Sequence, residues 1–403
     1  MFKNRNFLKL WISQMLSQVT INLMNFYVLT QIFLHTKSTI AVALMWIAGA
    51  LPALLFGPFS GPLVDSISRR KAMVITNLLQ AVTVAMLLFS PSVYYLYIIV
   101  FFYWLFDQIY LPSQQATIPQ VVPAKDLTKA NGIFLLTQQG SVLLGFGLGG
   151  ILLGILGRHT TIALAALGLV VAAVSVYFLP KDKPQVDLSQ KDFTRFWKDL
   201  LAGYSYVRSH REIFLPVLMV ICSQIFISVI SIVLPTFTHE VLHLNLNFAG
   251  LLLIVPGAIG ALLVTRSLPA YLKTARKKSV VEIGLLTGAI TLILLSLVIY
   301  LPMGRAFAAS VVAIGIGTAI AAVSVPSQTL IQERTPNWLR GRVYSQLSFM
   351  LIIASTLPIL IAGTLADILG VSVFMGILGI LLLSVYLFVS KKGDYVLANG
   401  FGL

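Results

Sequence analysis

The stretch GPLVDSISRRK, residues 61–71, joins two long apolar segments and sets one acid close to three adjacent cations. Charged side chains are costly next to the hydrocarbon core of a bilayer. Cations alone are enough to orient a membrane helix, so Asp65 needs another reason to be there. The spacing Gly61-x-Leu63-x-Asp65 therefore predicts that the acid contacts a partner helix at the membrane surface.

The composition of the chain is that of a protein embedded in a membrane. Hydrophobic residues make up 58% of it and charged residues only 10%, whereas about a quarter of a typical soluble domain is charged. A bilayer-spanning helix needs roughly 20 apolar residues. We predict an all-α membrane protein with twelve transmembrane helices, near residues 7–34, 40–64, 72–90, 94–119, 130–156, 160–179, 212–236, 246–270, 279–300, 306–331, 342–366 and 371–390.

The net charge of +15 falls almost entirely on one side of this predicted topology. Alternating the connections leaves only Lys37, Arg158 and Arg305 on the other side. Because cations accumulate in cytoplasmic loops, we expect a multi-pass protein of the plasma (inner) membrane with both termini in the cytoplasm. The partner of these cations is then an anionic lipid surface, and we expect no nucleic acid to bind.

The chain also repeats a motif, and the two copies are separated by a little more than half its length. Pro112-Ser113-Gln114 near the end of the fourth segment matches Pro326-Ser327-Gln328 near the end of the tenth. This predicts two pseudo-symmetric six-helix bundles, residues 1–179 and 212–403. The polar stretch 180–211 would join them, with an amphipathic helix from Phe193 to Val207 on the cytoplasmic surface or packed on protein.

Several motifs together resemble the major facilitator superfamily, and within it the twelve-helix drug-efflux branch of macrolide-efflux and enterobactin-exporter-like permeases. The first is the loop already quoted, with Gly61, Leu63, Asp65, Arg69 and Arg70. The others are the Pro112 to Pro123 region, Gln332-Glu333-Arg334 with Arg340-Gly341-Arg342, and an antiporter-like run of Gly145, Gly149 and Gly150. The resemblance implies that Asp65 accepts backbone N–H bonds from the start of the eleventh segment and latches the halves, with Arg69 and Arg70 pairing nearby. An ordinary topogenic cluster is the alternative.

Asp107 lies near the middle of the fourth segment and is the single acid deep within a predicted apolar span. Intramembrane acids usually face a cavity or a partner, and burial favours the neutral form of a carboxyl group. We interpret Asp107 as a candidate for proton coupling or for contact with a cationic substrate. The alternative is a structural acid bonded to Gln108, Gln114 or Tyr110.

Polar side chains on two helices are candidates for lining a solute cavity near the middle of the membrane. Amides in membrane helices also bind helices to one another, so both roles stay open. The candidates are Gln14, Gln18, Asn22 and Asn25 on the first segment, Gln114 on the fourth, and Gln224 and Ser228 on the seventh.

The chain offers no motif for catalysis or for a resident cofactor. His239-x-x-x-His243 lacks a third ligand, and no Walker A run points to ATP, so we expect no metal, no cofactor and no enzyme activity. The sequence predicts a monomeric secondary transporter that exports small amphipathic or hydrophobic compounds by alternating access, driven by the proton gradient. A facilitator or importer of an uncharged metabolite, with a structural Asp107, is the alternative.

Overall fold

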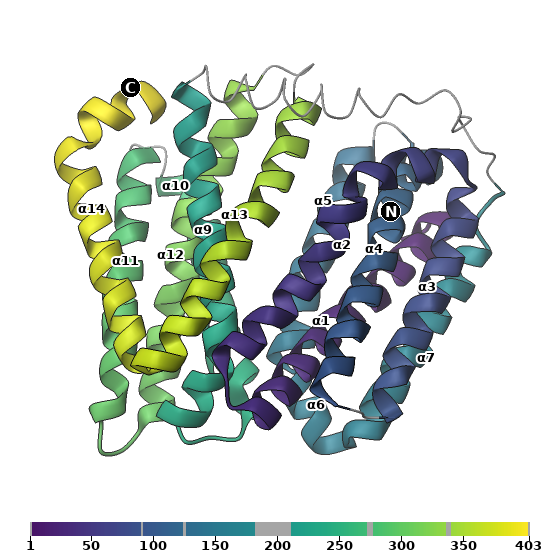
Figure 1. The fold of residues 1–403 in the computed structure, drawn as a ribbon. Coiled ribbons are helices and arrows are strands. Elements are labelled where there is room, and N and C mark those ends of the chain that lie inside the picture. The colour runs from purple at the N-terminus through teal and green to yellow at the C-terminus, as the bar shows by residue number, and fades with distance from the viewer. Residues whose placement is uncertain are drawn as a thin grey trace. The chain divides into compact units, whose positions relative to one another are not determined.

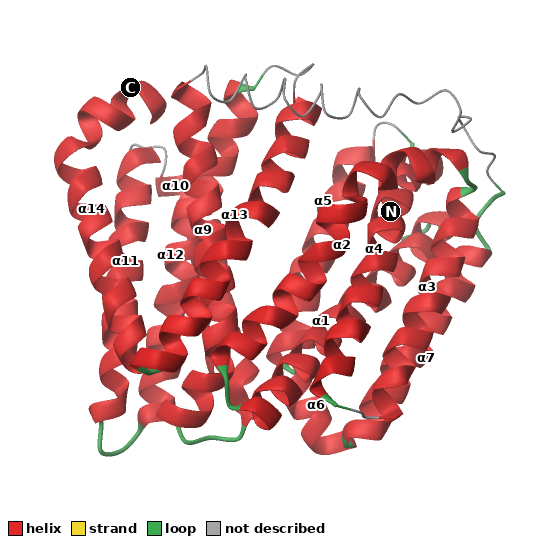
Figure 2. Ribbon diagram, in the orientation of Figure 1, coloured by secondary structure: helices red, strands yellow, loops and turns green. Residues whose placement is uncertain are grey.

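The structure is a computed structural model of the 403-residue chain. It describes residues 2–89, 92–123, 126–181, 211–271, 277–335 and 340–401. Across these ranges the ribbon consists of helices and short connections, with no strand (Figure 2). The predicted all-α fold class is confirmed.

The described residues of the first part of the chain, up to 181, form seven α-helices, coloured purple to blue in Figure 1. A 3₁₀ turn, Met86–Phe89, extends α3, and a π-turn, Leu143–Gly147, separates α5 from α6. The helices are α1 (Arg5–Thr36), α2 (Thr39–Ser66), α3 (Arg69–Ala85), α4 (Val93–Val121), α5 (Leu127–Val142), α6 (Gly149–Leu156) and α7 (Arg158–Tyr177).

The second part forms six α-helices, coloured teal to yellow in Figure 1. Irregular turns, Phe237–Val241, Leu246–Phe248 and Gly250–Ile254, lie between the first two of them. A 3₁₀ turn, Val298–Tyr300, follows the third. The helices are α9 (Arg211–Thr236), α10 (Val255–Tyr271), α11 (Lys277–Leu297), α12 (Arg305–Arg334), α13 (Arg340–Leu369) and α14 (Val371–Phe401).

The chain divides into two compact units. The first contains residues 1–36 and 44–192, and the second contains residues 37–43 and 193–403. The first turn of α2 thus belongs to the second unit, while the rest of α2 belongs to the first. The predicted linker, with its amphipathic helix from Phe193 to Val207, lies outside the described residues, and the predicted domain boundaries beside it stay predictions.

Ten of the described helices are long and apolar enough to cross a membrane, and the bent pair α5–α6 would be an eleventh span. Helix α1, which is 32 residues long, is not among them; it carries a series of amides and hydroxyls. The predicted number of twelve is reached if α1 and the bent pair both cross. The prediction of one continuous helix over 130–156 is wrong in detail, because the π-turn that contains Gly145 and Gly147 interrupts it.

Both units bury an apolar core and also present large apolar side chains on their surfaces. Phe7, Leu10 and Met73 are fully buried in the first unit, and Ile213, Ile331 and Val343 are buried in the second. Exposed apolar residues recur along the helices that frame each unit, among them Val82, Leu167, Val174, Leu262, Leu357 and Ile380. Such a surface suits a hydrocarbon environment, since soluble monomers rarely expose large apolar patches.

Candidate functional site

Asp107 is buried inside the first unit, with 6% of its surface exposed. The amide Nε2 of Gln80, on α3, donates a hydrogen bond to its Oδ1 at 3.5 Å. The sequence suggested Gln108, Gln114 or Tyr110 as the structural partner, and the partner that the structure shows is Gln80 instead. The sequence suggested residues near Asp107 on its own helix, whereas Gln80 is on α3 and comes within reach of Asp107 only when the two helices pack together.

Asp107 lies on α4 and Gln80 on α3. A second group of polar side chains joins these two helices to α1. The Asn77 amide on α3 donates to Ser13 Oγ on α1 at 3.2 Å. Ser13 Oγ and the hydroxyl of Tyr110, on α4, are 2.9 Å apart and share a hydrogen bond. All three side chains are fully buried. Ser13, Asn77, Gln80, Asp107 and Tyr110, which we call the polar core, therefore bring α1, α3 and α4 together through side-chain hydrogen bonds.

The polar residues of α1 are mostly engaged with the protein itself. Gln14 Nε2 donates to the carbonyl of Phe134, on α5, at 3.0 Å, and Asn22 Nδ2 donates to the carbonyl of Gln18 at 2.8 Å. Gln18 and Asn25 are buried as well. These bonds match the role of amides as contacts between and within helices, so Gln14 and Asn22 have an evident structural function.

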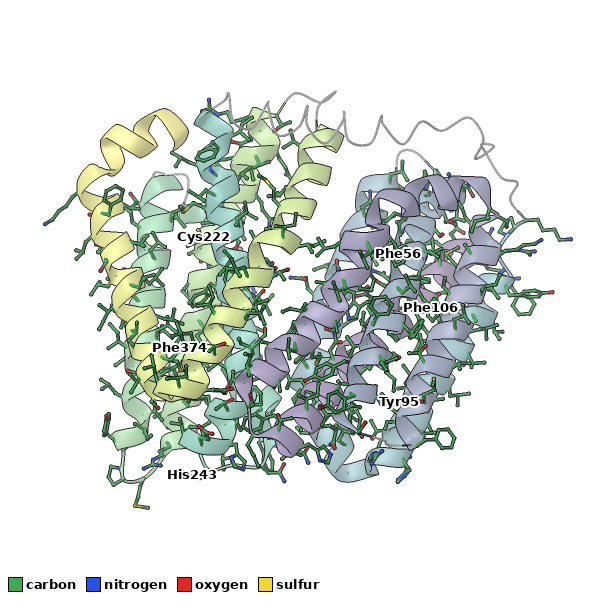
Figure 3. All side chains as sticks on the ribbon, in the orientation of Figure 1. Phe56, Tyr95, Phe106, Cys222, His243 and Phe374 are labelled. Carbon is green, nitrogen blue, oxygen red and sulfur yellow. The ribbon has the colours of Figure 1, made fainter. Side chains whose placement is uncertain are left out.

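Five buried amide oxygens among the described residues nevertheless retain acceptor capacity, and two of them, Asn77 Oδ1 and Gln80 Oε1, belong to the polar core. Gln14 Oε1, Asn25 Oδ1 and Gln114 Oε1 find no hydrogen-bond partner in the part of the chain that the structure describes. A buried acceptor without a donor is costly, and water or a solute with N–H or O–H groups would satisfy it. In the second unit Gln224 and Ser228 on α9 are only partly buried. Exposed Cys222, labelled in Figure 3, lies two residues before Gln224.

The side chains of Leu63 and Asp65 lie outside the described part of the structure, which places only the helical backbone of α2 there, Gly61 included. Residues 336–339, just before the eleventh segment, are also outside it. Arg69 Nη1 donates to the carbonyl of Ala116 at 2.9 Å, and Arg70 Nη1 donates to the carbonyl of Tyr177 at 3.2 Å. Both arginines thus tie the start of α3 to backbone within the first unit, and the latch role of Asp65 stays a prediction.

The glycines of the antiporter-like run lie against α1. A Cβ at Gly145 would overlap Asn22 and come within 2.7 Å of the backbone nitrogen of Leu23. A Cβ at Gly149 would approach Leu23 Cδ1 to 3.0 Å. Gly150, the next residue of α6, is buried as well. The π-turn and α6 therefore approach α1 as closely as they do because these positions carry no side chain.

One polar contact was not predicted from the sequence. Asp367, near the end of α13, accepts hydrogen bonds from the backbone nitrogens of Thr39 at 2.6 Å and Ile40 at 3.1 Å. The signal that would have found it is Gly363-x-Leu365-x-Asp367, which repeats the spacing of Gly61-x-Leu63-x-Asp65. The loop after the eighth segment, which corresponds by position to residues 61–71, does not have this spacing.

Comparison with known proteins agrees with the fold. The profile of the Major Facilitator Superfamily matches residues 10–357. YfiS of Bacillus subtilis, an uncharacterized MFS-type transporter, is 25% identical over 367 residues, 86% of this chain and 83% of its own. Macrolide efflux protein A of Streptococcus pyogenes is 24% identical over 396 residues, 94% of each chain.

A solved structure shows the same architecture. A mutant of the nucleoside transporter NupG superposes with a TM-score of 0.77 at 12% identity, covering 96% of this chain and 100% of NupG. The chain belongs to the Major Facilitator Superfamily. It is a multi-pass membrane transporter, as the resemblance in its motifs implied.

Proposed function

We propose that this transporter exports small amphipathic or hydrophobic compounds across the plasma membrane by alternating access, with proton entry as the driving force. The substrate class rests on the similarity to a macrolide efflux protein along 94% of both chains. Export by a secondary transporter needs an ionic gradient, and nothing in the sequence points to ATP. We propose the protein as a monomer with both termini in the cytoplasm.

The observation that carries the proposal is the burial of Asp107 in the polar core. A carboxyl group surrounded by protein and bonded to one neutral amide has no cation fixed beside it among the bonds that the structure describes. Burial favours the neutral, protonated form and a hydrogen bond favours the charged form. A group poised between the two forms can take up a proton in one conformation of the carrier and release it in another.

One observation favours a second candidate function. The same Gln80 bond gives Asp107 a structural partner on a neighbouring helix, which is what a purely structural acid needs. In that case the chain would be a facilitator or importer of an uncharged metabolite. The two candidates differ in whether a proton gradient moves the substrate uphill.

The test uses the purified full-length chain in proteoliposomes with an imposed pH gradient. The probes are erythromycin, as a macrolide, and ethidium, as an amphipathic cation. We expect the gradient to drive accumulation of at least one probe, and Asp107→Asn to reduce that accumulation at least tenfold while binding of the probe persists. An amide keeps most hydrogen bonds but cannot cycle a proton.

The matched control is Asp126→Asn, an acid-to-amide change at the start of α5 where the side chain makes no capping bond. It should transport like the wild type. Undiminished gradient-driven transport by Asp107→Asn would remove the coupling role. Loss of ethidium transport alone, with erythromycin transport intact, would assign Asp107 to cation binding instead.

Orientation is tested separately by reporter fusions. Fusions at Lys37, Arg158 and Arg305 should report the outside of the cell, because nearly all other cations lie on the opposite side of the predicted topology. A cytoplasmic signal at Arg158 would contradict the proposed orientation and the arrangement of six helices in the first half.

A further inference from the structure

The end of α13 binds the start of α2 through one carboxylate. Asp367 Oδ1 accepts the backbone N–H of Thr39 at 2.6 Å. Its Oδ2 accepts the hydroxyl of Ser38 at 2.6 Å and the backbone N–H of Ile40 at 3.1 Å. The first N–H groups of a helix have no partner within the helix, and negative charge is favourable at that end. Asp367 therefore caps α2 from another helix.

The helices approach closely enough for this bond because α13 carries a glycine one turn earlier. A Cβ at Gly363 would lie 3.0 Å from Ile40 Cα and 3.2 Å from Ala43 Cβ. On the other side of the same turn, Thr39 Oγ1 and Thr236 Oγ1, from α9, share a buried hydrogen bond of 2.7 Å. Val42 and Ala43 are fully buried there. The first turn of α2 is thus held by both α9 and α13.

This contact lies where α2 passes from one compact unit to the other. Residues 37–43 belong to the second unit and the rest of α2 to the first, yet α2 is helical without a break from Thr39 to Ser66. Transporters of this type work by moving one bundle against the other. Such a movement must either bend α2 near residue 43 or release its first turn from α9 and α13.

The sequence at the end of α13 repeats the sequence at the end of α2. Gly363-Thr364-Leu365-Ala366-Asp367 and Gly61-Pro62-Leu63-Val64-Asp65 share glycine, leucine and aspartate at the same spacing. In α13 the structure shows what two of these residues do. Gly363 permits the close approach of the helices, and Asp367 caps α2. Asp65 is at the opposite end of α2 from Thr39.

We propose that Asp367 is a conformational latch that holds the first turn of α2 against α9 and α13 and releases it during the transport cycle. The inference rests on alternating access but on no particular substrate or coupling ion. Asp367 would then act at the start of α2 as Asp65 is predicted to act at its end. The latch consists of Asp367, Gly363 and the Ser38–Ile40 segment.

The test measures the reactivity of one buried cysteine in the full-length chain. Cys222, the single native cysteine, is replaced by Cys222→Ser, and Val42→Cys is introduced into the buried face of the first turn of α2. N-ethylmaleimide crosses membranes, so its reaction does not depend on orientation. We expect Asp367→Ala to accelerate modification of the cysteine about fivefold, which is the effect of losing a typical helix cap. Asp367→Asn should accelerate it less, because the amide oxygen still accepts one hydrogen bond.

A second reporter separates release of the latch from unfolding. Val100→Cys places a thiol at a fully buried position of α4 in the first unit, and it should stay protected in the Asp367→Ala background. Acceleration at position 42 alone supports the latch. Unchanged reactivity at position 42 overturns it, and acceleration at both positions overturns it as well, since Asp367 would then stabilise the fold as a whole. Because no substrate is involved, failure here leaves the export proposal to its own transport assay.

Discussion

The two units differ in the contacts that hold most of their helices together. In the first, the polar core joins α1, α3 and α4 by hydrogen bonds between side chains. In the second, polar bonds between helices hold the first turn of α2, through Thr39 and Asp367, whereas the buried hydroxyls of Ser223, Thr238 and Ser327 each donate to the carbonyl four residues earlier. There α10 and α12 approach through glycines, and a Cβ at Gly317 would overlap the carbonyl oxygen of Gly257.

The difference shows where chemistry beyond packing is concentrated. Small residues are enough to bring membrane helices together, and α10 and α12 need nothing more. Buried polar groups are costly when they lack partners, and in the polar core Asn77 Oδ1 and Gln80 Oε1 have none among the described residues. The polar core is therefore more than packing requires. The polar core, with the proposed proton carrier Asp107, thus belongs to the first of the two units.

The largest effect should come from the glycine contact of the second unit. Gly317→Leu would force α10 and α12 apart, and we expect a loss of about 3 kcal/mol or more in the free energy of unfolding, measured by denaturant titration in detergent micelles. Gly140→Leu is the control, because a Cβ at Gly140 meets nothing within 4 Å. Equal stability of the two variants would show that α10 and α12 do not depend on close approach.

An intermediate effect should follow removal of the central hydroxyl of the polar core. Ser13→Ala leaves the Asn77 amide and the Tyr110 hydroxyl without the partner that both share. We expect a loss of about 2 kcal/mol in the same unfolding measurement, the cost of leaving buried polar groups unpaired. A loss below about 0.5 kcal/mol would mean that the polar core is held by packing and would remove the contrast between the units.

The smallest effect should come from a serine of matched burial in the second unit. Ser327 is fully buried, as Ser13 is, but its hydroxyl donates only to the Val323 carbonyl of its own helix at 2.7 Å. Such backward bonds contribute little to stability, so Ser327→Ala should change the free energy of unfolding by no more than about 0.5 kcal/mol. A loss as large as that of Ser13→Ala would make the two units equivalent.

The helices could be predicted well because each is a long apolar run bounded by polar or glycine residues. The segment predicted at 40–64 is α2, Thr39–Ser66, and the one predicted at 94–119 is α4, Val93–Val121. Departures occur where backbone geometry changes without a change in hydropathy. The π-turn at Leu143–Gly147 is such a case, since its residues are as apolar as their neighbours.

The candidate site could be predicted only in part. Asp107 and Gln14 could be identified because a polar residue within an apolar run stands out in the sequence. Their partners, Gln80 and the Phe134 carbonyl, depend on how the helices rotate against one another, which hydropathy does not encode. Asp367 was missed although its spacing could be read, because an acid at a helix end looks like part of an ordinary connection.

The glycine three residues after Asp367 fixes the geometry of the junction between α13 and α14. Gly370 alone separates α13 from α14, with φ at +80°, a conformation that only glycine adopts at little cost. Any other residue at position 370 would strain the junction of the two helices, three residues from the carboxylate that caps α2.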